Sequence, residues 1–186
     1  MTGLTALWLP IVLSAVFVFI ASSIVHMALP WHKADYPKLP NEDAFRAAVG
    51  PLKIPPGEYM TPRADSMDEM KSPEFQAKFT QGPVMMLTVR PNAWTQMGPM
   101  LAKWFVYCLV VSLFGAYIAG RALPAGSNYL QVFRFAGATS FAGYTLALWQ
   151  GHIWYYKSLR YTITSSLDGL LYACLTAGTF GWLWPK

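Results

Sequence analysis

Charged side chains are scarce in this sequence and nearly absent from most of its length. Only 12% of the 186 residues are Asp, Glu, Lys or Arg, whereas an average soluble domain has about 25%. Residues 30–99 contain eight basic and eight acidic side chains, and the rest of the chain contains only seven charged residues. This distribution excludes an ordinary soluble enzyme, and the 54% hydrophobic content excludes a disordered chain.

Cysteine is also rare, and the familiar catalytic motifs are missing. The two cysteines, Cys108 and Cys174, both lie in apolar stretches, which excludes a disulfide-stabilised scaffold. The sequence contains no CxxC, HExxH, GxSxG, GxGxxG or phosphate-binding-loop pattern. We therefore predict no catalytic residue and no metal site, and we favour a non-enzymatic role over an enzymatic one.

Long apolar stretches are abundant. Four of them, over about residues 7–29, 100–120, 129–150 and 162–184, reach the roughly 20 residues that a helix needs to cross a bilayer. Seven of the eight tryptophans lie near the ends of these stretches, as expected for side chains at a membrane–water interface. We therefore predict an all-α integral membrane protein with four transmembrane helices, whose first partner is the lipid bilayer.

The positive charges flank these stretches. The net charge of +5 therefore does not indicate a nucleic-acid partner. The first stretch is predicted to be a retained anchor and not a cleaved signal peptide, because residues 1–6 contain no Lys or Arg and the stretch is too long. Most basic residues near the helix ends lie on the side of the 30–99 loop, so the positive-inside rule predicts that this loop is cytoplasmic and both termini are outside.

The predicted organisation has three parts. Residues 1–29 form the first transmembrane helix, residues 30–99 form an extramembrane loop or cap, and residues 100–186 form the second to fourth transmembrane helices. In the cap we expect helices over residues 41–49 and 72–80, and strands over residues 58–61 and 84–89. The cap is thus a small mixed α/β segment, although the second strand could instead lie on the lipid surface.

Small residues recur every four positions in the last two apolar stretches. Such spacing places them on one face of a helix, where another backbone can approach closely. Whether the contact is within one chain or between chains stays open. The predicted helix-packing residues are Ser165, Gly169, Ala173, Ala177 and Gly181 in the fourth stretch, and Gly143 and Ala147, with Thr139 and Gly151, in the third.

A few polar groups are expected at the loop end of the bundle. Asp168 is the only acidic residue in the apolar stretches, and the topology places it at the same level as His26, His152 and Lys103. Ionisable groups inside a bilayer mark candidate functional sites. His26, His152 and Asp168 could relay protons or bind haem or quinone. We favour the simpler interpretation that one Asp–Lys or Asp–His pair fixes helix register and that no cofactor is bound.

Three segments carry a resemblance to a known family. They are His26-Met27-Ala28-Leu29-Pro30-Trp31-His32-Lys33, Gly82-Pro83-Val84-Met85-Met86-Leu87-Thr88-Val89 and Gly178-Thr179-Phe180-Gly181-Trp182-Leu183-Trp184-Pro185. They resemble a family of uncharacterised bacterial multi-pass inner-membrane proteins. The resemblance implies a location in the bacterial inner (cytoplasmic) membrane and assigns no catalytic residue.

Three functions follow as hypotheses. The one we favour is a non-enzymatic accessory or scaffold subunit that assembles with other membrane subunits, or a homo-oligomer. The second is a redox or proton-handling module that binds haem or quinone near His26, His152 and Asp168. The third is a small transporter, which the single intramembrane carboxylate and the lack of a convincing internal repeat make less favourable.

Overall fold

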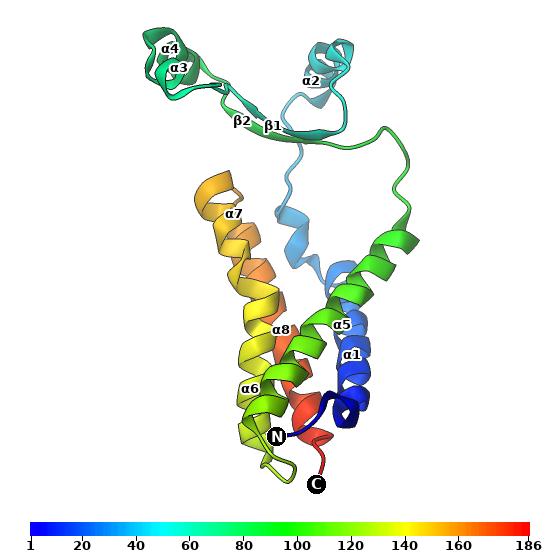
Figure 1. The fold of residues 1–186 in the computed structure, drawn as a ribbon. Coiled ribbons are helices and arrows are strands. Elements are labelled where there is room, and N and C mark those ends of the chain that lie inside the picture. The colour runs from blue at the N-terminus through cyan, green and yellow to red at the C-terminus, as the bar shows by residue number, and fades with distance from the viewer. The chain divides into compact units, whose positions relative to one another are not determined.

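The computed structural model describes all residues from Met1 to Lys186 and is mostly helical, with one small two-stranded sheet. The chain forms two compact units (Figure 1). The larger unit combines Met1–Pro37 with Gln96–Lys186, and the smaller unit is Lys38–Thr95. Residues 30–37, which we assigned to the extramembrane loop, thus pack with the helices.

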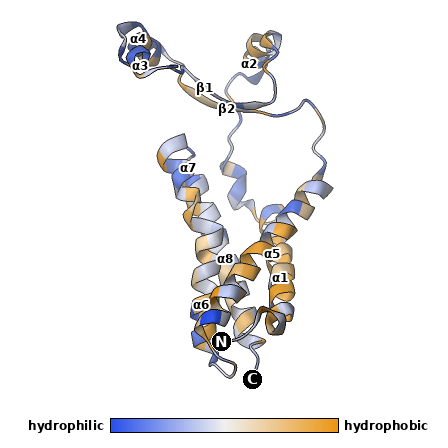
Figure 2. Ribbon diagram, in the orientation of Figure 1, coloured by the Kyte–Doolittle hydropathy of each residue, from blue (hydrophilic) through white to orange (hydrophobic).

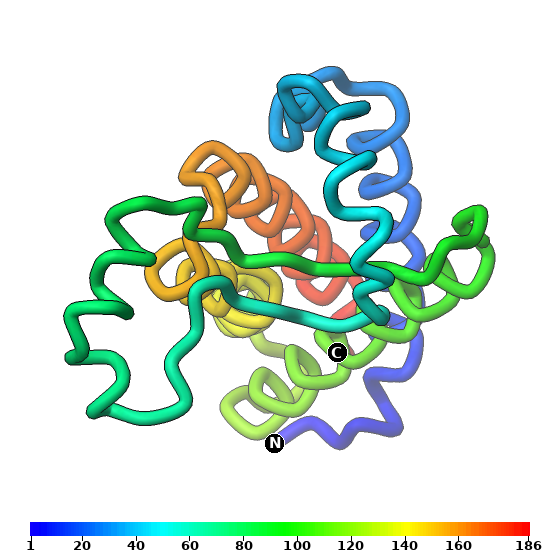
Figure 3. The backbone as a smooth tube through the Cα atoms, turned by 90° about the horizontal axis from the view of Figure 1, so that it is seen from above, coloured from blue at the N-terminus to red at the C-terminus, as the bar shows by residue number.

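The larger unit is a bundle of four helical rods. Seen from above, α8 lies between α1 and the α6–α7 rod (Figure 3), and α8 packs closely against both. The N- and C-termini lie at the same end of the bundle (Figure 1). Its helices are α1 (Trp8–Ala28, preceded by a 3₁₀ turn at Leu4–Leu7), α5 (Met97–Ala122), α6 (Tyr129–Phe141), α7 (Leu148–Tyr155) and α8 (Leu159–Trp182).

Two of these rods, Leu4–Ala28 and Met97–Ala122, are long and apolar enough to cross a membrane. Figure 2 shows both coloured as hydrophobic along most of their length. The two rods support association of the protein with a membrane. The rod of α8 has similar length at 24 residues, but it contains Asp168 and several hydroxyl side chains that lower its hydropathy.

The third rod is not the continuous α-helix that we expected. A π-helical turn at Ala142–Leu146 separates α6 from α7. A π turn holds more residues than an α turn, so it rotates the helix face that follows it. As a result Ala147, predicted to pack against another helix, lies exposed on the surface. Gly143 packs as expected for a small residue, because a Cβ there would lie 3.2 Å from a Val111 methyl group.

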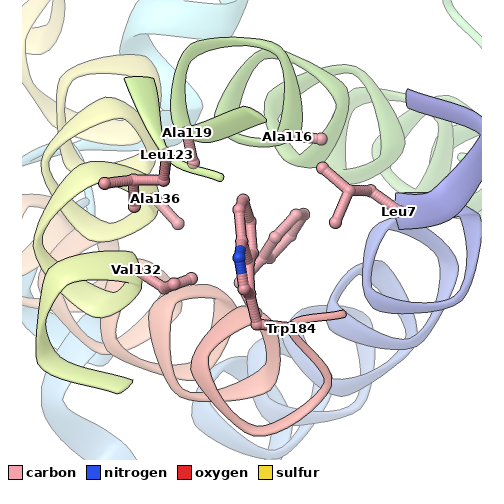
Figure 4. Close-up of a cluster of buried hydrophobic side chains, with 8 residues drawn as sticks. Leu7, Ala116, Ala119, Leu123, Val132, Ala136 and Trp184 are labelled. Atoms are coloured by element: carbon pink, nitrogen blue, oxygen red, sulfur yellow. The ribbon is translucent and has the colours of Figure 1, made fainter. Parts of the chain in front are cut away.

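One end of the bundle is closed by a compact apolar cluster. Trp184 points inward from the end of the chain, toward Leu7, Ala116 and Val132 on three other rods (Figure 4). Its indole Nε1 donates a hydrogen bond of 2.9 Å to the carbonyl oxygen of Pro124. The cluster thus ties both ends of the chain to the middle helices.

The small-residue face of α8 is used within the chain. Gly169, Ala173 and Ala177 are buried, and Ser165 and Gly181 are half-buried. The contact is tightest where backbones approach most closely. A Cβ added to Gly137 of α6 would lie 3.0 Å from the Ala177 Cβ, and one added to Gly181 would lie 2.6 Å from the ring of Tyr129. This face of α8 therefore makes its contacts within the chain, with α6 and with the π-helical turn.

The interior of the bundle mixes apolar and polar side chains, and its surface carries many large apolar ones. Its buried side chains include Ser14, Ser112, Ser140, Thr145, Thr162, Asp168 and Thr176, whereas leucine, isoleucine, valine and phenylalanine side chains of the same helices are exposed. Several of the hydroxyls are hydrogen-bonded, among them Ser14 to Ser112 at 3.0 Å. The helices of a soluble bundle differ at the surface, where they present charged and polar side chains.

The smaller unit contains the predicted mixture of short elements. They are α2 (Glu42–Val49), β1 (Gly57–Thr61), α3 (Met67–Lys71), α4 (Pro73–Gln81) and β2 (Met85–Val89). The strands are antiparallel, with Tyr59 opposite Leu87 and Met60 opposite Met86. Ser66 and Ser72 cap α3 and α4 by accepting hydrogen bonds from the backbone N–H groups of Glu69 and Phe75. Helix α3 was not predicted.

The apolar core of the smaller unit is very small. Phe75 is its only buried hydrophobic side chain, and it lies 5.3 Å from the half-exposed ring of Phe79. No helix of this unit packs extensively against the sheet. An isolated two-stranded sheet is only marginally stable in water.

We predict that Gly169→Ala destabilises the bundle by about 1–3 kcal/mol relative to Gly178→Ala. The Cβ added at position 169 would collide with Thr145 Oγ1 and lie 3.3 Å from Tyr144 Cβ, whereas the Cβ added at 178 would have an ordinary contact of 3.5 Å with Tyr129. Both variants gain the same helix propensity, so the difference isolates packing. Thermal unfolding of the detergent-solubilised proteins measures it, and equal melting temperatures would contradict the close packing of α8.

Candidate functional site

The most concentrated group of polar side chains in the larger unit lies where the chain leaves α1. Leu29 has extended backbone geometry, and Pro30 then begins a 3₁₀ turn over Pro30–Ala34. The turn packs against α8. It thereby brings His32 and Asp35 to the side of Asp168, a carboxylate that is only 4% exposed.

His32 lies between two carboxylates. Its Nδ1 is 2.8 Å from Asp35 Oδ2, and its Nε2 is 2.8 Å from Asp168 Oδ2. The first contact is a hydrogen bond. The second has the distance of an ion pair without the alignment of a hydrogen bond, since Nε2 of His32 and Oδ1 of Asp168 are both buried without a hydrogen-bond partner. A neutral imidazole carries one N–H and can serve only one of the two carboxylates, whereas an imidazolium can serve both.

Asp35 connects His32 to α8. Its side chain is 2% exposed, and its Oδ2 accepts a hydrogen bond of 3.0 Å from Thr164 Oγ1. Arg160 Nε lies 3.5 Å from Asp35 Oδ1. Burial raises the pKa of the Asp35 carboxyl, but the hydrogen bonds from His32 and Thr164 and the charges of His32 and Arg160 outweigh it, so the pKa lies below its usual value. Asp35 is therefore an anion at neutral pH.

His26 completes the group from the last turn of α1. Its ring stacks on that of His32, with the centroids 4.5 Å apart and the planes 13° from parallel. Its Nδ1 lies 3.0 Å from the carbonyl oxygen of Ser22. A hydrogen bond to that oxygen requires the proton on Nδ1, so in a neutral ring Nε2 carries a free lone pair. One ligand atom each from His26, His32 and Asp168 can be chosen so that all three lie within 4.8 Å of one another.

The structure brings together only two of the three residues that we expected to share a site. His26 and Asp168 are neighbours, but His152 is not part of the group. Its Nδ1 lies 2.7 Å from the carbonyl oxygen of Lys157, in the connection after α7. Lys103 is exposed and forms no ion pair, so the partner of Asp168 is His32 and not Lys103.

His32 and Asp35 take the place that we expected His152 to fill. Sequence reasoning missed them because both follow Pro30, beyond the predicted end of the helix, where a solvated loop was expected. A turn that folds back over the bundle is not encoded by helical periodicity. The only signal was local: Pro30 followed by Trp31, His32 and Asp35, an unusual density of aromatic and ionisable groups at a helix end.

Comparisons with known proteins do not identify this arrangement. No family model, curated protein or solved structure matches the chain. The chemistry of the site therefore rests on its geometry alone: a buried carboxylate, two stacked imidazoles and a second carboxylate that holds one of them.

We predict that Asp35→Asn lowers the melting temperature of the solubilised protein. The variant keeps the shape of the side chain but loses its charge, and hydrogen bonds to charged groups contribute about 1.5–3 kcal/mol. Asp43→Asn is the matched control, because Asp43 is exposed in the first turn of α2. Equal stability of the two variants would show that the buried Asp35–His32 contact does not support the fold.

Proposed function

We propose that the chain is a four-span integral membrane protein of the bacterial inner membrane, with the smaller unit on the cytoplasmic side. The proposal is supported by the two apolar rods and by the large apolar side chains exposed on α6, α7 and α8 as well. Lys33 precedes the smaller unit and Lys38 and Arg90 lie near its two ends, as the positive-inside rule requires of a cytoplasmic segment.

We further propose that the protein is a non-enzymatic accessory subunit that assembles with another membrane protein through the smaller unit. The observation that carries this proposal is the single buried hydrophobic residue of that unit, Phe75. A segment of this size cannot be stable on so small a core and needs a surface to cover its exposed apolar side chains. These include Met60, Met67, Met70, Phe79, Met86 and Trp94.

Assembly through the small-residue face of α8 is the weaker alternative. Homo-oligomers of membrane helices often use such faces. Here Gly169, Ala173 and Ala177 are already covered by the π-helical turn and α6 of the same chain. In the smaller unit, by contrast, Phe75 is the only buried hydrophobic side chain, and its other large apolar side chains have no lipid to cover them.

The direct test is extraction of the natively expressed protein in mild detergent, with the particle mass and the co-purifying chains determined together. We expect a particle that contains other subunits in a fixed ratio. A particle made of several copies of this chain alone would contradict the accessory role and support a homo-oligomer. A monomeric particle would remove both.

We predict that Met86→Glu reduces co-purification of the partner about tenfold or more, the effect of roughly 1.4 kcal/mol or more at an interface. Met86 is 43% exposed and lies opposite Met60 on one face of the sheet. Gln81→Glu is the control, because it adds the same charge at an exposed polar position of the same unit. If both variants retain the partner equally, the sheet is not the docking surface.

A further inference from the structure

The group of His26, His32 and Asp168 has the features of a metal site as well as those of an ion pair. All three side chains belong to the larger unit, and they come from the end of α1, the following turn and α8. Two imidazole nitrogens and one carboxylate oxygen are a donor set that Zn²⁺ and Fe²⁺ accept in proteins. The accessory role proposed above neither requires nor explains such a group.

The outer contacts of the two histidines orient them in the same way. Each uses Nδ1 for a contact away from the group: His26 with the carbonyl oxygen of Ser22 at 3.0 Å, and His32 with the carboxylate of Asp35 at 2.8 Å. Metal-ligating histidines in proteins almost always donate their second N–H to such a carbonyl or carboxylate. The Nε2 atom of each ring is therefore left without such a contact, and that of His32 lies 2.8 Å from Asp168 Oδ2.

Two atoms inside the group are buried and have no hydrogen-bond partner. They are Nε2 of His32 and Oδ1 of Asp168, and the Asp168 residue is 4% exposed. A purely structural ion pair would align the N–H of His32 with a carboxylate oxygen. The observed contact of 2.8 Å lacks that alignment and leaves Nε2 of His32 and Oδ1 of Asp168 available to a ligand.

The distances are compatible with an ion after a small adjustment. In a tetrahedral site with metal–ligand bonds of about 2.0–2.2 Å, neighbouring donor atoms lie about 3.3 Å apart. The present separations run from 2.8 Å to at most 4.8 Å. Rotation of the exposed His26 side chain is the least costly way to close the longest of them, since the other two side chains are held by packing.

Charge favours a divalent cation at this place. Asp168 contributes one negative charge as a ligand, and Asp35 contributes a second through the N–H of His32. Arg160, 56% exposed, lies beside Asp35 and not beside the donor atoms. From these observations we propose that His26, His32 and Asp168 bind one divalent transition-metal ion, with Asp35 as the positioning residue of His32. The exposed side, at His26, leaves a coordination position for water or for a ligand from a partner.

The test uses the full chain without a polyhistidine tag, purified in detergent and stripped with a chelator. Zn²⁺ is then added, and its stoichiometry and affinity are measured together with the melting temperature. We expect one Zn²⁺ per chain and, at 100 times the dissociation constant, a rise in melting temperature of roughly 5–10 °C. Co²⁺ in place of Zn²⁺ should give the visible absorption of a nitrogen- and oxygen-ligated ion.

His26→Gln is the decisive variant because it separates a metal ligand from a structural ion pair. His26 is exposed and takes no part in either carboxylate contact, so the metal-free variant should unfold at the temperature of the wild type. Its affinity for Zn²⁺ should fall by at least 10–100-fold. Loss of a residue that only hydrogen-bonds to a metal ligand already has an effect of this size. His152→Gln is the matched control and should bind Zn²⁺ as the wild type does.

Two results would overturn the proposal. One is that the wild type binds less than one Zn²⁺ per chain, with no change in melting temperature. The other is that His26→Gln and His152→Gln bind Zn²⁺ with the same affinity as the wild type, which would assign the bound ion to other surface groups. In either case the His32–Asp168 contact is a structural ion pair only.

Discussion

A buried carboxylate among apolar helices must have a partner. The contacts between the turn after α1 and α8 supply that partner for Asp168. Removal of an unpaired carboxylate from water costs several kcal/mol, so Asp168 can persist at 4% exposure only beside a compensating group. The partner comes from outside the helices: the 3₁₀ turn after α1 brings His32 to within 2.8 Å. Asp35 holds this segment against α8, the helix that contains Asp168. It accepts a hydrogen bond from Thr164 and lies beside Arg160, both of which belong to α8.

The close approach of the helices follows from small side chains rather than from a large apolar core. In a lipid environment the hydrophobic effect does not drive helices together, and association depends on packing and on polar contacts between them. The structure uses both means. Gly137 meets Ala177 at the contact of α6 with α8, and Trp104 of α5 donates a hydrogen bond of 2.8 Å to Ser22 of α1. Neither contact would form if larger side chains kept the helices apart.

Helical periodicity and capping residues were enough to predict most of the elements. The helices over Glu42–Val49 and Pro73–Gln81 and the two strands form as expected, because each has its own start and stop signals. What could not be predicted depends on three-dimensional packing. The π-helical turn at Ala142–Leu146 has no motif, and it places Ala147 on the surface.

The candidate site shows the same limit. His26 and Asp168 were found because both lie within apolar stretches, where an ionisable residue is conspicuous. His152 was chosen as the third member by its depth in the bundle. The actual third member, His32, stands six residues after His26. That spacing belongs to no helical metal motif, and the two rings are brought together by the extended Leu29 and the 3₁₀ turn that follows it. The stacking of the rings, 4.5 Å apart, is a product of that turn.

The polar group also decides how the chain leaves the bundle. Asp35 is buried, and the chain passes into the smaller unit three residues later, at Lys38. The other connection has no such restraint: Gln96 makes no side-chain cap at the start of α5, and Arg90 bonds instead to Thr95 within the smaller unit. One connection is therefore fixed to α8 by hydrogen bonds and charge, and the other is held only by the helix that follows it. Asp35 is the residue that links this fixed connection to His32.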